Sequence, residues 1–237
     1  GFSFGYFAGL AGLLLSVPLI LGLTNTQSTL EDESDTVGYR LCMVMCGFWW
    51  AGFYYYPWKR LRTRPGKPLP PRATYVSQTF VEMKETVMVL IRYPQAVKYL
   101  LLWFAMSDGV FIIGTIATLF ADAEIDWGCV PKSIGLLAIT LLAALFAGLG
   151  TAAATRVQTL LGASTKSMLI GSLALAAVIP CWGLLGFAFA GFGLKKGWEV
   201  MALAVLYGLS MGPMQGFSRT IFGQMLPPGK EAALFAL

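Results

Sequence analysis

The sequence has no histidine, and charged residues make up only 12% of it, against 57% hydrophobic residues. Without histidine there is no Ser–His or Cys–His nucleophilic triad, no histidine metal site and no histidine proton switch. The chain also has no Gly-x-Ser-x-Gly elbow of the kind that an intramembrane lipase needs. We therefore predict that the protein is not an enzyme and that it has no catalytic residue, metal site or cofactor.

Four cysteines are spread along the chain, and Cys42 and Cys46, which are four apart, have no histidine or acidic neighbours. Because such thiols make a poor metal site, we interpret them as small buried residues. They are Cys42, Cys46, Cys129 and Cys181.

The hydrophobic residues are too numerous for the interior of a soluble domain of this length, and they are gathered in long runs. Runs of about 20 apolar residues match a bilayer core of about 30 Å. The sequence therefore predicts an all-α, polytopic transmembrane helix bundle with about six spans and the start of a seventh after residue 230. The expected spans are residues 1–23, 37–58, 99–120, 132–155, 167–191 and 198–222.

One long polar interval, residues 57–98, separates two groups of these spans. It holds nine of the seventeen Lys and Arg residues, and only two acidic residues. A basic loop between apolar spans lies on the cytoplasmic side of a membrane, and the acidic loops 24–36 and 121–132 belong on the other side. The net charge of +5 does not indicate nucleic-acid binding, because no groove-reading motif accompanies the basic residues.

We divide the chain into three parts: 1–58, the last two helices of an N-terminal half; 59–98, a basic cytoplasmic linker; and 99–237, a truncated C-terminal half. Within the linker, apolar residues recur at helical spacing over residues 74–91, which predicts an amphipathic helix against membrane lipids or under the bundle. Because residue 1 is not Met and already lies in an apolar run, we expect the chain to be a fragment.

Asp108 is the one charged side chain near the middle of an expected span. An aspartate at that depth costs about 2.5 to 3.5 kcal/mol on insertion scales, so it has to face a polar cavity or a partner. Two interpretations are open: a carboxylate that couples transport to protons or contacts a substrate, or a structural acid bonded to neighbouring polar groups.

Three other side chains are candidates for substrate contact. Gln215 and Arg219 are four residues apart and share a helix face, although Arg219 is close enough to the membrane surface to be a snorkelling cation. Tyr6 lies in the first span. We expect the helix that carries Gln215 to be broken near its centre, where freed backbone groups would line a cavity or find partners. The residues behind this expectation are Gly208, Gly212, Pro213 and Gly216.

Small residues mark two expected packing faces. Gly1, Gly5 and Gly9 fall four apart in the first span, and Ala143 and Ala147 fall four apart in the fourth. Small side chains let helix backbones approach closely in a membrane. We expect these two faces to pack across the two halves of the bundle.

Several local sequences, taken in order, resemble those of a known family. They are Gly5-Tyr6 and Gly9 in the first span, Phe48-Trp49-Trp50 before the linker, Ser107-Asp108-Gly109-Val110 after it, and Gln215-Gly216-Phe217-Ser218-Arg219 followed by Leu226-Pro227 and Lys230-Glu231-Ala232. Together with the basic central loop, they resemble the autophagy-related vacuolar amino-acid effluxers of the major facilitator superfamily, over about helices five to ten of twelve.

This resemblance implies a multi-pass protein of the vacuolar membrane that exports neutral amino acids, such as leucine, isoleucine and tyrosine, to the cytosol after autophagic degradation. Its partners would be amino acids and membrane lipids, with protons as the candidate coupling ion and no nucleic acid. The alternative is a receptor or scaffold of transporter shape that moves nothing and acts through its basic loop.

Overall fold

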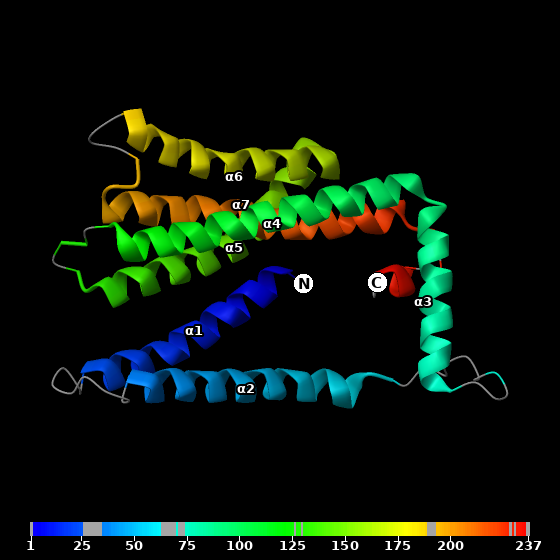
Figure 1. The fold of residues 1–237 in the computed structure, drawn as a ribbon, viewed down its shortest axis with the longest axis horizontal. Coiled ribbons are helices and arrows are strands. Elements are labelled where there is room, and N and C mark those ends of the chain that lie inside the picture. Colours follow the sequence, from blue (N-terminus) through cyan, green and yellow to red (C-terminus); the bar gives the residue numbers. More distant parts are fainter. Residues whose placement is uncertain are drawn as a thin grey trace. The chain divides into compact units, whose positions relative to one another are not determined.

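The computed structural model describes residues 2–25, 35–62, 70, 74–125, 127–128, 130–188, 193–227, 229 and 231–235. In this part of the chain the secondary structure is helical (Figure 1). Gly1, the acidic loop before residue 35 and most of the proline-rich linker lie outside the described residues. The helices are α1 (Phe2–Asn25), α2 (Asp35–Arg60), α3 (Tyr75–Ile91), α4 (Pro94–Ala123), α5 (Lys132–Leu161), α6 (Thr165–Ala188), α7 (Gly197–Met225) and α8 (Glu231–Phe235).

The prediction of an all-α, polytopic bundle is confirmed. Four helices, α4 to α7, are long and apolar enough to cross a membrane, and α1 contributes a shorter apolar stretch, Ser3–Val17, within its described residues. The amphipathic helix expected over residues 74–91 is present as α3. That α1 and α2 also cross the membrane stays a prediction.

By its internal contacts the chain divides into two compact units, residues 4–67 and residues 68–237 together with the first three. In the first unit, the indole of Trp49 on α2 lies 3.6 Å from where a Cβ on Gly12 of α1 would be. Near the end of α2, the ammonium of Lys59 lies 4.7 Å from the centre of the Tyr55 ring, a cation–π contact. This pairing of aromatic and basic side chains is typical of a helix end at the membrane surface.

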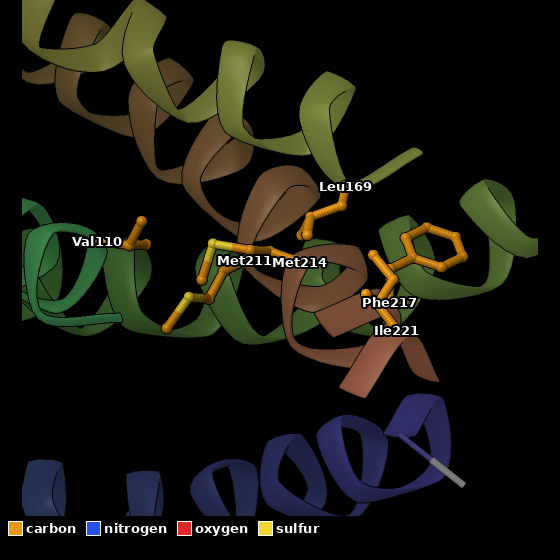
Figure 2. Close-up of a cluster of buried hydrophobic side chains, with 6 residues drawn as sticks. All are labelled: Val110, Leu169, Met211, Met214, Phe217 and Ile221. Carbon is orange, nitrogen blue, oxygen red and sulfur yellow. The ribbon is translucent and has the colours of Figure 1, made fainter. Parts of the chain in front are cut away.

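The second unit is built around α7, which packs against α4, α5 and α6. Of the four long apolar helices, α7 has the largest buried share, because it packs against the other three. Its core joins side chains from α4, α6 and α7 (Figure 2): Val110, Leu169, Met211, Met214, Phe217 and Ile221. This unit therefore provides the rigid body in which a site can be held.

The expectation that α7 is broken near its centre is wrong. It is one continuous helix through Pro213, and its glycines serve packing instead. A Cβ on Gly208 would collide with the carbonyl oxygen of Ala143, and a Cβ on Gly212 would collide with that of Ala147. The two backbones thus touch along a seam of small residues, which is how helices associate closely in a membrane.

At one end of this unit, α3 lies crosswise to the ends of α4 and α7, near α8 (Figure 1). Leu90 of α3, Phe222 of α7 and Leu234 of α8 share one buried cluster. Tyr99 of α4 donates its hydroxyl hydrogen to the carbonyl oxygen of Ser218, at 2.9 Å. The shared cluster holds α3 against the end of the bundle, and the hydrogen bond joins α4 to α7.

The interpretation of the cysteines as buried residues is wrong for two of them. Cys46 on α2 and Cys181 on α6 are both exposed free thiols. Each lies on an apolar helix where an outward position is compatible with a small, weakly polar side chain.

Candidate functional site

A groove of about 290 Å³ runs between α4 and α5 and has α7 as its floor. Its walls are mostly aliphatic, with a few hydroxyl groups among them. This composition is typical of a small-molecule site, where apolar surface provides most of the contact and a few polar groups fix orientation. The lining comprises Phe111, Ile113, Gly114, Thr115, Ala117 and Thr118 of α4, Ile139, Thr140 and Ala143 of α5, Val200, Leu203, Ala204 and Tyr207 of α7, and Ile179 and Leu194.

The floor of the groove depends on a glycine. A Cβ on Gly114 would lie only 2.6 Å from the Tyr207 hydroxyl oxygen, so the tyrosine reaches this position because α4 has no side chain there. Three threonines on the walls, Thr115, Thr118 and Thr140, each donate to a carbonyl of their own helix, at 2.9 to 3.1 Å. Their hydroxyl oxygens keep acceptor capacity for a ligand.

Asp108 is exposed, and it lies on α4 just before the groove begins. Phe111 and Thr115, three and seven residues further on, line the groove and so share a helix face with it. The helical rise places the Cα of Asp108 about 4.5 Å along the axis from that of Phe111. Val110, by contrast, points into the core. Asp108 therefore belongs to the groove side of α4 and not to its packed side.

Two other predicted contact residues lie on α7. Arg219 is exposed and lines a second, more polar cavity, beside Thr151 and Gln158 of α5. Gln158 donates from Nε2 to the hydroxyl oxygen of Thr165 at 3.3 Å across the α5–α6 turn. Gln215 is half-buried and is not among the described residues that line either cavity.

Tyr6 belongs to the other unit, where it is half-buried on α1. The structure thus places Asp108 on α4 next to the apolar groove without lining it, places Arg219 in the second cavity, and does not gather all four candidates in one place. Their roles in substrate contact stay predictions.

The predicted packing residues also have different surroundings. Ala147 is buried against α7, and Ala143 both contacts α7 and lines the groove. Gly5 and Gly9 are exposed, and a Cβ on either would meet nothing within 4 Å among the described residues. Packing of these two faces across the halves stays a prediction.

The sequence reasoning missed Glu199, the one fully buried charged side chain among the described residues, at 1% exposure. Its Oε2 accepts hydrogen bonds from Trp182 Nε1 at 3.2 Å and from the backbone N–H groups of Gly193 and Leu194 at 3.0 and 2.7 Å. Its Oε1 is buried and makes no hydrogen bond of ordinary geometry in the described part of the chain. The sequence carries only a weak signal for it, an acidic residue in the first turn of a helix after a glycine-containing loop.

Comparisons with known proteins identify a family for this chain. The family model described as "Vacuole effluxer Atg22 like" matches residues 1–237. Autophagy-related protein 22-1 of Aspergillus niger is 30% identical over 100% of this chain and 38% of its own length. Autophagy-related protein 22-2 of Emericella nidulans is 32% identical over 100% of this chain and 42% of its own. Autophagy-related protein 22 of Yarrowia lipolytica is 30% identical over 100% of this chain and 41% of its own length.

No solved structure matches this chain. The chain spans about two fifths of the length of the curated relatives that it matches.

Proposed function

Because the chain belongs to the vacuole effluxer family and is part of a multi-pass protein of the vacuolar membrane, we propose that it is the central portion of a secondary transporter that exports neutral amino acids from the vacuole to the cytosol. Leucine, isoleucine and tyrosine are the proposed cargo. The observation that carries the proposal is the position of Asp108 beside an apolar groove, on the same face of α4 as Phe111 and Thr115.

A neutral amino acid has a charged end and an apolar end, and the groove side of α4 offers a partner for each. The carboxylate of Asp108 pairs with the substrate ammonium. The aliphatic groove receives the substrate side chain, where burying it is favourable by about 25 cal/mol per Å². The charged groups of a zwitterion cost free energy to desolvate, so pairing one of them with Asp108 is what makes entry tolerable.

We also propose that protons are the coupling ion and that the basic linker faces the cytosol. Of the groups on the groove side of α4, Asp108 is the one that can take up a proton. Its carboxylate is therefore the proposed site of proton binding. The linker orientation follows from the excess of Lys and Arg over residues 57–98.

The test uses the full-length protein in liposomes loaded with labelled leucine. Asp108→Asn removes the charge at nearly constant volume. Efflux should fall about tenfold or more, as expected when a charge-assisted interaction of about 1.5 to 3 kcal/mol is lost. Dependence of efflux on a proton gradient should be lost as well.

Asp122→Asn is the matched control, because Asp122 is an exposed acid on the same helix. Its carboxylate pairs with Lys132 at 3.0 Å, outside the groove. A surface ion pair of this kind contributes only about 0 to 1 kcal/mol, so efflux should stay close to that of the wild type. Equal efflux from wild type and Asp108→Asn would refute the role of the carboxylate.

A second candidate function is a scaffold that moves nothing and works through the basic linker. The exposed apolar side chains of α3, Val76 and Phe80 among them, favour a surface that meets lipid or a partner. The scaffold function would be supported if liposomes that contain the wild-type protein kept their leucine while the linker still bound anionic vesicles.

A further inference from the structure

We propose that Glu199 is a positioning residue that holds Leu194 across the end of the groove farthest from α3, so that this turn closes the groove on the vacuolar-lumen side. The proposal rests on the transport function proposed above. It adds a closing element and the residue that controls it.

The first observation is the way Glu199 holds the turn before α7. Its Oε2 receives two backbone N–H donors from consecutive residues, Gly193 and Leu194, and a third donor from Trp182 of α6. Consecutive backbone N–H groups that converge on one oxygen form a nest, an arrangement suited to an anion. The side chain is almost completely buried, so these charge-assisted bonds form away from water, where they are strong.

The second observation is the conformation of the turn itself. Leu194 has a φ of 66° and is the non-glycine residue with positive φ in the described chain. A leucine adopts this left-handed conformation only when its surroundings impose it. Gly193, with φ of 100°, lets the backbone pass close to Gly186 of α6, where a Cβ would not fit. Glu199 is the side chain that bonds to both N–H groups of this turn.

The third observation is what Leu194 does. Its side chain lines the groove and packs against the buried cluster at this end, which includes Ile139 of α5 and Val200 of α7. It also lies 3.3 Å from the Cβ position of Gly183 on α6. Leu194 thus bridges three helices at the mouth of the groove, where a substrate that comes from the lumen would enter.

The buried Oε1 of Glu199 favours a turn that can open and close. It makes no hydrogen bond of ordinary geometry among the described residues, while the backbone N–H of Lys195 also interacts with the carboxylate. Opening of the turn would admit water to that oxygen and relieve the left-handed strain at Leu194, while breaking the three bonds to Oε2.

The experiment measures access to the groove and does not depend on transport. A full-length protein without native cysteines carries Thr118→Cys in the groove, and a membrane-impermeant maleimide is added on the lumenal side. Glu199→Ala should raise the labelling rate about tenfold, because it removes a buried charged acceptor. Glu199→Gln keeps one acceptor oxygen for the turn, and its rate should rise only about threefold.

Two further variants separate closure from general damage. Ser133→Cys, on the exposed start of α5, should label equally in every background because it lies outside the groove. Leu194→Gly keeps the N–H that Glu199 binds and removes both the strain and the side chain. It should raise labelling at Thr118→Cys as much as Glu199→Ala does, and the strain that it relieves offsets part of the packing lost with the side chain.

The results decide the proposal even if Glu199→Ala fails to fold, because Leu194→Gly relieves strain and is expected to fold. Unchanged labelling at Thr118→Cys in Leu194→Gly would overturn the proposal. If both variants label faster while the wild-type protein moves no amino acid, the closing turn stands and the transport function fails.

Discussion

Two pairs of glycines in this chain have the same spacing and opposite surroundings. Gly208 and Gly212 of α7 bring that helix into backbone contact with α5, whereas Gly5 and Gly9 of α1 have open space around them within the described residues. Spacing of four residues indicates that a helix has a small-residue face. It does not indicate what that face packs against, which depends on the neighbouring helix having small residues at matching heights, as α5 does with Ala143 and Ala147.

The largest effect is expected from Gly212→Ala. The new methyl group would meet the backbone carbonyl of Ala147 and the hydroxyl of Thr151, and a helix backbone cannot move aside as a side chain can. Overpacking of this kind costs about 1 to 3 kcal/mol. The melting temperature of the full-length protein in detergent should fall by several degrees.

Gly171→Ala on α6 is the matched control, because nothing lies within 4 Å of the added Cβ. Its melting temperature should stay at or slightly above the wild-type value, since alanine favours a helix more than glycine does. If Gly212→Ala were as stable as Gly171→Ala, the close contact of α5 and α7 would be wrong.

The smallest effect is expected from Gly9→Ala. With no described neighbour within 4 Å, the substitution should change the free energy of unfolding by no more than about 0.5 kcal/mol. The same thermal measurement checks it. A loss as large as that of Gly212→Ala would show that the α1 face is occupied in the full-length protein, and it would support the predicted packing across the two halves.

Much of the fold could be predicted from the sequence because it depends mainly on the order of apolar and polar segments along the chain. Long apolar runs and the basic interval 57–98 set the number and order of the helices, and α3 and α7 begin and end within a few residues of the expected bounds. The prediction failed where packing overrides local preference. Pro213 and the glycines of α7 indicated a broken helix, but α7 is continuous and packs against α4, α5 and α6.

The site could be predicted only in part. Asp108 stands out in the sequence because a charge inside an apolar run has no ordinary explanation. Glu199 does not, because Lys195 and Lys196 beside it make it look like a loop residue. Its burial depends on backbone donors from the preceding turn and on Trp182, 17 residues earlier. The groove could not be predicted from the sequence either, because its lining residues, such as Phe111 and Tyr207, come from different helices.

The central claim is that a neutral amino acid occupies the groove beside Asp108. It is tested most directly by substrate protection of Thr115→Cys in the full-length protein without native cysteines. Leucine should slow maleimide labelling of Thr115→Cys and leave labelling of Ser167→Cys, an exposed position at the start of α6, unchanged. Equal labelling of Thr115→Cys with and without saturating leucine, in protein that transports leucine, would contradict the account.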